Sequence, residues 1–308
     1  MQPLIIELAM NGETQLSRNP HVSRRPEAIA AEAIACIDQG AALVHNHTDD
    51  PMLVGEAAAA RYAEGWAPIL AAHPDAILCP TNSGGRDPAE RVAHLAPCAR
   101  AGARMAAIDP GSMNMPLSGG GVGQARVLSY VNDFDRISMV LSVMREAGVA
   151  ASIGIYEPGF LRAAVAFHRA GLTPPGSFVK LYFFGGANYY DAKPCIGFGL
   201  SPSAAALDAY LDIIGESDLP WAAAVVGGSV VESGMAELAI LRGGHVRVGL
   251  EDYAGGRTPT NAELIGEVAV LASAAGRPLA TPAAAARILG MPSRRPMPLR
   301  RVEYKNGA

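Results

Sequence analysis

An α/β fold with eight parallel strands is predicted by three features of the 308-residue sequence. A short apolar run, a few polar or Gly/Pro residues and an Ala/Leu-rich segment of helical spacing recur in this order about eight times. The apolar runs are nearly continuous, which is typical of strands buried on both faces of a parallel sheet. The length matches one (β/α)8 barrel, or TIM barrel, so we expect a single barrel domain over residues 1–308.

The expected strands are the apolar runs 4–8, 42–45, 76–79, 104–108, 150–155, 178–183, 221–226 and 246–250. Between them, helices long enough to connect parallel strands are expected to begin near Pro26, Glu56, Pro88, Tyr130, Gly159, Ser203, Val231 and Asn261. Pro26 and Pro88 suit the first turn of a helix. The expected helix ends are marked by Gly40, Gly102, Gly148, Gly171 and Gly243.

A doubly wound open sheet is the main alternative to the barrel. Its dinucleotide-binding glycines would have to open the first helix, and residues 10–14 offer none of that pattern. The glycine-rich stretch 118–123 follows no strand directly and lacks the Lys-Ser/Thr ending of a phosphate loop, so a plain loop is expected. The tail, residues 292–308, is rich in proline and arginine, and we expect an extended arm on the surface or on another subunit.

Composition restricts the kind of partner. The net charge of −4 argues against a nucleic-acid or anionic-membrane surface, since either needs a concentrated basic field. Four widely spaced cysteines indicate neither a disulfide framework nor a thiolate metal site. Glu7 interrupts the first apolar run, and no stretch reaches the roughly 18 apolar residues that span a bilayer. We therefore expect a cytoplasmic protein that acts on a small molecule, with no nucleic-acid or membrane partner.

Two strand ends carry residues that bind metals. His45 and His47 share one face of the second strand, and Glu251 ends the eighth. In a closed barrel the first strand lies between these two, so the three side chains can meet. Two imidazoles and one carboxylate with an open position form the catalytic type of zinc site, and we predict Zn2+ there. Ordinary strand-end histidines are the alternative.

Arg247 lies inside the eighth apolar strand, where a guanidinium must be paired. Asp252 is the expected partner, and the pair would keep this carboxylate ionised beside the metal, where it could act as a base. A structural salt bridge is the alternative.

Polar residues follow the other strands as well, which in a barrel gathers them at one end. The small donors and backbone amides of Thr81, Asn82, Ser83, Gly84 and Gly85 would suit a carboxylate or an oxyanion. A plain βα turn is the alternative for this segment. Ser112 and Glu157 are the other residues that we predict to contact substrate.

At these residues the chain resembles the β-keto acid cleavage enzymes, the 3-keto-5-aminohexanoate cleavage enzyme-like family. The matching segments are 11–14, the His45-x-His47 pair, the 83–85 turn, 243–252, 261–264 and 280–290, so the resemblance covers essentially the whole chain. The 243–252 motif is the most specific of them.

The resemblance implies a zinc barrel that condenses a β-keto acid with acetyl-CoA and gives acetoacetate and a new acyl-CoA. It assigns zinc to His45, His47 and Glu251 and the base to Asp252, paired with Arg247. It gives Glu13 a polar catalytic role in the substrate site and implies a homo-oligomer, a dimer or a tetramer. A zinc aldolase or hydrolase that works without CoA, and a non-catalytic ligand-binding barrel, are the alternatives.

Three departures from the family pattern are visible. Asp49 stands where the family usually has arginine, and Gly154 stands where the fifth strand usually carries glutamate. A glycine-rich segment, residues 115–122, replaces the usual one after the fourth strand. We expect these changes to alter substrate preference.

Overall fold

The structure is a computed structural model that describes residues 1–120, 126–188 and 190–293. Its main strands are β1 (Ile6–Ala9), β2 (Leu43–Asn46), β3 (Ile77–Pro80), β4 (Met105–Ile108), β7 (Ala150–Ile155), β8 (Phe178–Phe184), β9 (Trp221–Val226) and β10 (His245–Val248). A separate hairpin is formed by β5 (Met113–Pro116) and β6 (Val127–Tyr130). The helices are α1 (Pro26–Asp38), α2 (Gly55–Ala72), the 3-10 turn η1 (Glu90–Val92), α3 (Leu95–Arg100), α4 (Phe134–Ala147), α5 (Pro158–Arg169), α6 (Ala204–Ile214), α7 (Met235–Leu241), α8 (Asn261–Ala274) and α9 (Pro282–Ile288).

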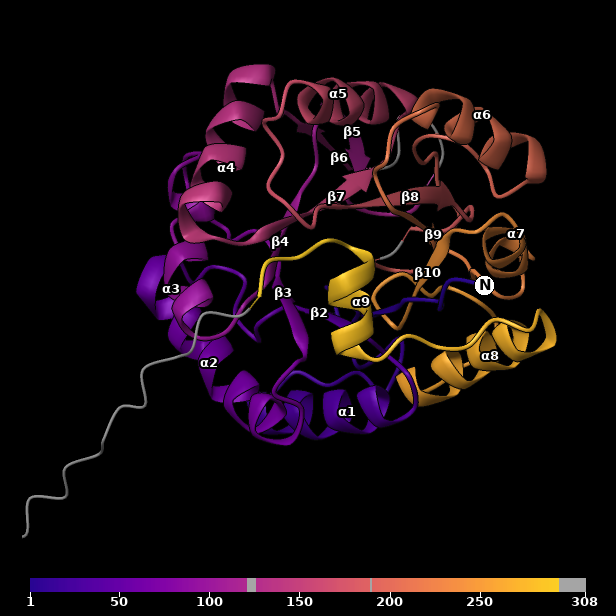
Figure 1. Cartoon of the computed structure of the whole chain (residues 1–308), viewed down its shortest axis with the longest axis horizontal. Helices are drawn as coiled ribbons and strands as arrows, with labels where there is room; N and C mark the ends of the chain where they lie inside the picture. The colour runs from indigo at the N-terminus through magenta and orange to yellow at the C-terminus, as the bar shows by residue number, and fades with distance from the viewer. Residues whose placement is uncertain (121–125, 189, 294–308) are drawn as a thin grey trace, which may run out of the picture.

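Eight strands form one sheet in the order β3-β2-β1-β10-β9-β8-β7-β4, and every pair is parallel. The two edge strands meet at a parallel bridge between Leu78 and Ala103, where the Arg104 amide donates to the Leu78 carbonyl at 3.1 Å. The sheet therefore closes on itself with the helices outside it (Figure 1). The predicted (β/α)8 barrel is confirmed.

The elements form for local reasons that the sequence carries. All six residues of β7 are buried, as expected of a strand covered on both faces. Helix α8 begins with a capping box, in which Thr260 and Glu263 satisfy each other's backbone amides. Gly148 ends α4 at a φ of +71°, a conformation that glycine adopts without steric strain. All eight expected strands overlap observed ones.

Three expected helix starts are wrong. Val231 lies in a turn, and α7 begins only at Met235. Pro88 lies in a turn, and the helix expected there is divided into η1 and the short α3. Tyr130 is the last residue of β6, and α4 begins only at Phe134, after Asp133 caps it by accepting from the Arg136 amide. The β5–β6 hairpin occupies the connection that was expected to lead directly into this helix.

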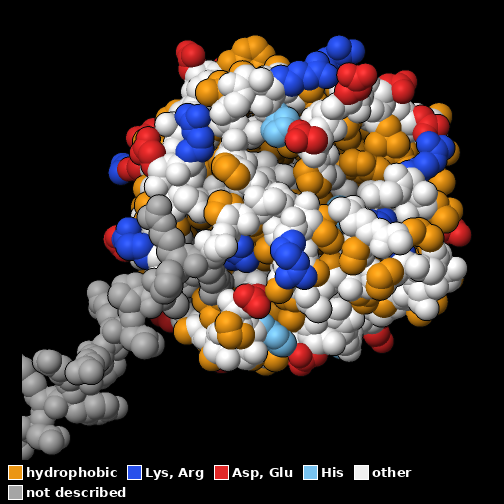
Figure 2. Space-filling view, viewed as in Figure 1, with side chains coloured by type: hydrophobic (Ala, Val, Ile, Leu, Met, Phe, Trp, Pro, Cys, Tyr) orange, Lys and Arg blue, Asp and Glu red, His pale blue; other side chains and the backbone are white. Residues whose placement is uncertain are grey.

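Helix α9 closes the amino end of the barrel, where it crosses the centre of the view in Figure 1. Ala285 and Leu289 pack there against a buried layer that includes Ile5, Leu43 and Phe178. The face in Figure 2 carries acidic and basic side chains interspersed around its rim. With the amino end sealed, the carboxyl ends of the strands are left to form the site.

Two expectations concern segments that are described only in part. The glycine-rich loop 118–123 lies outside the described residues from 121 onward, and the tail lies outside them from 294 onward. Within the described part of the chain, none of the helices has the length and apolar character needed to span a bilayer.

Candidate active site

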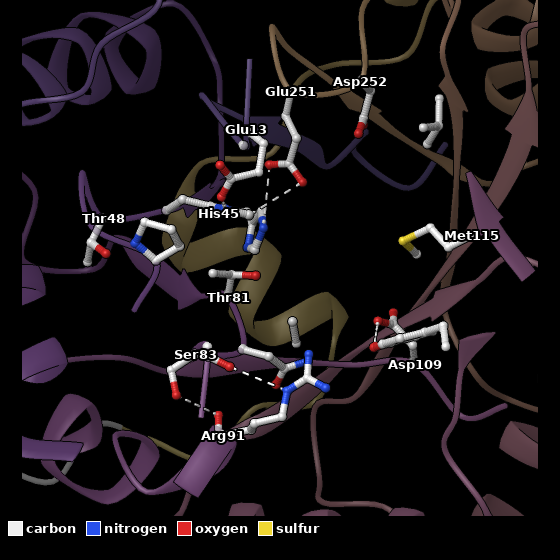
Figure 3. Close-up of a pocket in the computed structure, with 18 of the residues that line it drawn as sticks. Glu13, His45, Thr48, Thr81, Ser83, Arg91, Asp109, Met115, Glu251 and Asp252 are labelled. Atoms are coloured by element: carbon white, nitrogen blue, oxygen red, sulfur yellow. Dashed lines mark hydrogen bonds and ion pairs between the residues drawn. The ribbon is translucent and has the colours of Figure 1, made fainter. Parts of the chain in front are cut away.

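A cavity of about 270 Å³ opens at the carboxyl ends of the strands. Every barrel strand, or the loop directly after it, contributes to its lining: Glu13, His45, Thr81, Asp109, Tyr156, Lys180, Val226 and Glu251 are one example from each. Figure 3 shows Glu251, Asp252 and Glu13 on one wall and Ser83, Arg91 and Asp109 on the other, with His45 and Thr81 between. The polar residues of distant segments therefore meet in one space, as the barrel prediction requires.

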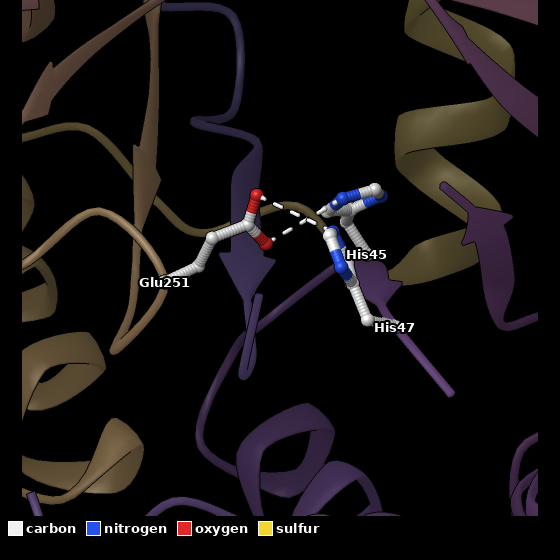
Figure 4. Close-up of side chains that lie close together, drawn as sticks. All are labelled: His45, His47 and Glu251. Carbon is white, nitrogen blue, oxygen red and sulfur yellow. Dashed lines mark ion pairs between the residues drawn. The ribbon is translucent and has the colours of Figure 1, made fainter. Parts of the chain in front are cut away.

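The three predicted metal ligands lie together. The Glu251 carboxylate faces both imidazoles, with Oε2 3.5 Å from Nε2 of His45 and Oε1 3.8 Å from Nε2 of His47 (Figure 4). One ligand atom from each residue lies within 4.8 Å of the others. Among residues 1–120, 126–188 and 190–293, Nε2 of His47 and Oε2 of Glu251 have no hydrogen-bond partner and are buried, as expected of atoms that coordinate a cation. Two imidazole nitrogens and a carboxylate oxygen fit zinc with a position left open.

The other nitrogen of each imidazole has a partner that orients the ring. Nδ1 of His45 lies 3.1 Å from the Cys79 carbonyl oxygen, and Nδ1 of His47 lies 3.3 Å from Oε1 of Glu13. Such outer hydrogen bonds fix the tautomer that presents Nε2 to a metal. Glu13, for which a substrate-site role was predicted, therefore also contacts a candidate ligand.

The predicted pair of Arg247 and Asp252 is confirmed as a two-pronged contact, with Nε donating to Oδ2 at 2.8 Å and Nη2 to Oδ1 at 3.1 Å. The same guanidinium donates to Oε1 of Glu7 at 2.9 Å and lies 2.8 Å from Oε1 of Glu251. Lys180 approaches Glu7 at 3.6 Å. The carboxylates of Glu7, Glu251 and Asp252 thus face the cations of Arg247 and Lys180, which leaves one negative charge in excess. A divalent metal at the cluster would make the net charge of the site positive.

This network shifts the two neighbouring carboxylates in opposite directions. Burial opposes ionisation of Glu251, but Arg247 and the two histidines outweigh it and lower its pKa well below the usual range. For Asp252, burial raises the pKa, and the nearby carboxylates raise it further, so that the opposing effect of Arg247 is overcome. Arg247 lowers the pKa of Asp252 as expected, but burial and the nearby carboxylates outweigh it, so the net shift is upward. A raised pKa brings a carboxylate closer to the range of an effective general base.

The turn after β10 explains how Glu251 and Asp252 reach the site. Gly249 has a φ of +153°, and a Cβ there would lie 2.1 Å from the Ala9 carbonyl oxygen. The backbone can pass this close only because the residue is glycine. The Glu251 amide then donates to the same carbonyl at 3.1 Å.

Glu7 and Lys180 were missed as site residues. Both are almost fully buried and belong to the Arg247 network. The same feature of the sequence that pointed to Arg247 was available for both, because each is a charged residue inside an apolar strand. Glu7 also pairs in register with Arg247 across β1 and β10.

Asp109 was noticed at a strand end but not assigned to the site, although it lines the cavity. Tyr130 of the hairpin donates to its Oδ2 at 2.7 Å, and removal from water raises the pKa of Asp109. A Cβ on Gly154 would lie 2.3 Å from Oδ1 of Asp109. Asp109, directly after β4, therefore fills the space that a side chain at position 154 of β7 would need, which accounts for the glycine there.

Asp49, the other departure, faces away from this chemistry. Its carboxylate pairs with Arg61 on α2, with Nε donating to Oδ1 at 2.8 Å. Asp49 is absent from the lining of the cavity.

The segment from Thr81 to Gly85 is built differently from the expectation. Thr81, Asn82, Ser83 and Gly84 line the cavity, but the amides of Thr81, Ser83 and Gly84 already donate to oxygens within the chain. These three amides are therefore not free to bind an anion. Gly85 is absent from the lining.

Ser112 and Glu157 are not brought to the cavity. The Ser112 hydroxyl accepts from the Asn132 amide at 2.8 Å, and Oε1 of Glu157 accepts from the Gly199 amide at 2.9 Å. Both side chains hold neighbouring loops.

Comparison with known proteins agrees with this geometry. A family model described as beta-keto acid cleavage enzyme matches residues 3–291. The 3-keto-5-aminohexanoate cleavage enzyme of Fusobacterium nucleatum is 30% identical over 300 residues, covering 94% of this chain and 99% of that protein. The 3-oxoadipate:acetyl-CoA acetyltransferase of Cupriavidus necator is 29% identical over 306 residues, covering 95% of this chain and 96% of that protein.

A solved structure is similar in fold. The apo structure of ObcA matches with a TM-score of 0.64 and 17% identity, over 88% of this chain and 66% of that one. At this identity the likeness shows the barrel fold alone.

Proposed function

Because this chain belongs to the β-keto acid cleavage enzyme family, we propose that it condenses a β-keto acid with acetyl-CoA in a zinc-dependent reaction that yields acetoacetate and a new acyl-CoA. The observation that carries the proposal is that the His45, His47 and Glu251 cluster and the Arg247–Asp252 pair open onto one cavity. The names of two relatives, the 3-oxoadipate acetyltransferase and a 3,5-dioxohexanoate:acetyl-CoA acetone transferase, support acetyl-CoA as the second substrate.

His45, His47 and Glu251 would hold the metal, which when bound supplies a Lewis acid for the oxygens of the keto acid. Asp252 takes the C2 proton. Arg247 holds both oxygens of that carboxylate and fixes the direction from which it approaches C2. Glu7 in turn holds Arg247 from the far side, so the base is positioned by a fully buried contact.

The electron pair left at C2 attacks the thioester carbonyl of acetyl-CoA, and the CoA thiolate leaves. The thiolate then adds to the 3-keto carbonyl, and cleavage of the bond between C2 and C3 releases the new acyl-CoA. The remaining carbanion is that of acetoacetate, and it takes back the proton from Asp252. Proton and electrons balance without any further reactant.

The test is to incubate the purified protein with a panel of β-keto acids and acetyl-CoA and to measure acetoacetate and metal content. We expect acetoacetate only when acetyl-CoA is present, and one zinc per chain. Cleavage of a keto acid without acetyl-CoA would favour the aldolase or hydrolase alternative. Full turnover by protein that holds no metal would contradict the proposal.

A further inference from the structure

The wall opposite the metal cluster carries a guanidinium that faces the cavity, that of Arg91 (Figure 3). Arg91 is half-buried on η1. Within the described part of the chain, its one side-chain hydrogen bond is a long one, from Nε to the Ser83 carbonyl at 3.4 Å. Among the described residues no carboxylate forms an ion pair with it, whereas Arg247 on the other wall contacts three.

The chain fixes the position of Arg91 through its backbone. The Ser83 amide donates to the Arg91 carbonyl at 3.1 Å, and the Ser83 hydroxyl lies 3.2 Å from the carbonyls of Glu90 and Arg91. A Cβ on Gly85 would lie 2.6 Å from the Arg91 amide nitrogen, so only glycine permits this close approach. The turn after β3 therefore presents an arginine to the cavity, in place of its own amides.

The charges on this wall favour an anion. A smaller hollow of about 20 Å³ adjoins the cavity and is lined by Arg91, Arg136 and Asp109. Two guanidinium groups thus face one carboxylate. Asp109 is directed to the Tyr130 hydroxyl, which donates to it at 2.7 Å. The free guanidinium donors of Arg91 match the planar geometry of a carboxylate.

We propose that Arg91 binds a second carboxylate at the far end of the substrate, so that the preferred β-keto acid is a dicarboxylate. The inference rests on the proposed function in one respect, because the ligand is taken to be the keto acid substrate. The keto acid end lies at the metal cluster beside Asp252, and the tail reaches the opposite wall. A half-buried guanidinium without a carboxylate partner is partly removed from water, and the substrate's second carboxylate supplies that partner.

The test uses three keto acids that share a carbon chain of similar length and differ in the charge of the tail. These are 3-oxoadipate, 3-oxohexanoate and 3-keto-5-aminohexanoate, each with acetyl-CoA. We expect kcat/KM for acetoacetate formation to be roughly 10- to 100-fold higher with 3-oxoadipate than with 3-oxohexanoate, as for a hydrogen-bonded charged contact. The keto acid with the cationic tail, 3-keto-5-aminohexanoate, should have the lowest kcat/KM of the three.

Arg91→Gln should remove that preference. It should lower kcat/KM for 3-oxoadipate by the same factor and leave that for 3-oxohexanoate within about twofold. The preference of Arg91→Lys for 3-oxoadipate should lie between those of the wild type and Arg91→Gln, because lysine keeps the positive charge but loses the planar two-donor geometry of the guanidinium. Both variants lose the long Nε contact to Ser83 but retain the Ser83 contacts to the Arg91 backbone, so the fold is expected to persist. Arg86→Gln is the matched control, because Arg86 lies on the same loop with a side chain that is 91% exposed.

Three results would overturn the inference. The wild type could favour the neutral or cationic tail, Arg91→Gln could lower all three rates equally, or the variant could raise only the KM for acetyl-CoA. The last result would assign Arg91 to a CoA phosphate. If no keto acid yields acetoacetate, the proposed function fails. The affinity of each keto acid for the protein, measured by calorimetry without acetyl-CoA, then tests the carboxylate site at Arg91 separately. Tighter binding of 3-oxoadipate than of 3-oxohexanoate, lost in Arg91→Gln, upholds the inference, and equal binding of both refutes it.

Discussion

Replacing Asp252 by asparagine separates a catalytic role of this residue from a structural one. The side chain keeps its shape but cannot accept the C2 proton, and one guanidinium N–H of Arg247 is left facing an amide group. General-base catalysis contributes about 10² to 10⁴-fold. We therefore expect Asp252→Asn to exchange the C2 hydrogens of the keto acid at least about 100-fold more slowly than the wild type.

The loss of stability should be much smaller than the loss of rate. Arg247 still contacts Glu7 at 2.9 Å and Glu251 at 2.8 Å in the variant, so it does not become an unpaired buried charge. The free energy of unfolding should fall by about 1 to 3 kcal/mol, as for one charged hydrogen-bonded contact. A typical domain has about 5 to 15 kcal/mol, so most molecules remain folded.

The assay follows deuterium incorporation at C2 by NMR in heavy water without acetyl-CoA, corrected for spontaneous enolisation. Asp208→Asn is the control, because it breaks an exposed aspartate–arginine pair between Asp208 of α6 and Arg242, which follows α7. Its exchange rate should equal that of the wild type. Exchange by Asp252→Asn at the wild-type rate would refute the assignment of the base.

Three further predictions follow from the same geometry. Replacing His47 or Glu251 by Ala should sharply lower the zinc content measured by elemental analysis, and full occupancy in either variant would refute the ligand set. Burial opposes ionisation of Glu7, but Lys180 and Arg247 lower its pKa below the ordinary 4.5. The ionised Glu7 therefore stabilises the folded state above pH 4.5, and this stabilisation is lost as the pH falls through its lowered pKa. Urea denaturation should therefore show that the difference in unfolding free energy between the wild type and Glu7→Gln is largest near neutral pH and shrinks below pH 4.5. A difference that does not change with pH would contradict this prediction. Gly154→Ala should lower the melting temperature and displace Asp109, with a loss of about 1 to 3 kcal/mol, whereas an unchanged melting temperature would show that the space is free.

The barrel and the metal cluster could be predicted from the sequence because both depend on local patterns. Eight repeats of strand and helix define the closed sheet, and closure brings the eighth strand beside the first. Once that neighbourhood is known, the i, i+2 spacing of His45 and His47 and the strand-end position of Glu251 are enough to bring three candidate ligands together.

The rest of the site depends on contacts between segments that are far apart in the chain. The contact of Tyr130 with Asp109 requires the β5–β6 hairpin, which the sequence does not signal. The direction of Arg91 depends on how the Ser83 turn holds η1. Glu7 and Lys180 could have been found, since a charge inside an apolar strand is visible without any structure.

The adjacency of Glu251 and Asp252 has a consequence for how this site can diversify. One guanidinium contacts both carboxylates, and one glycine turn carries both. Under the proposed function, a change that moves Glu251 as metal ligand also moves Asp252 as base, so the two roles are not adjusted independently. We therefore expect variation in substrate to arise at the opposite wall, where Arg91 of η1 and Tyr130 of the hairpin line the cavity away from Glu251 and Asp252.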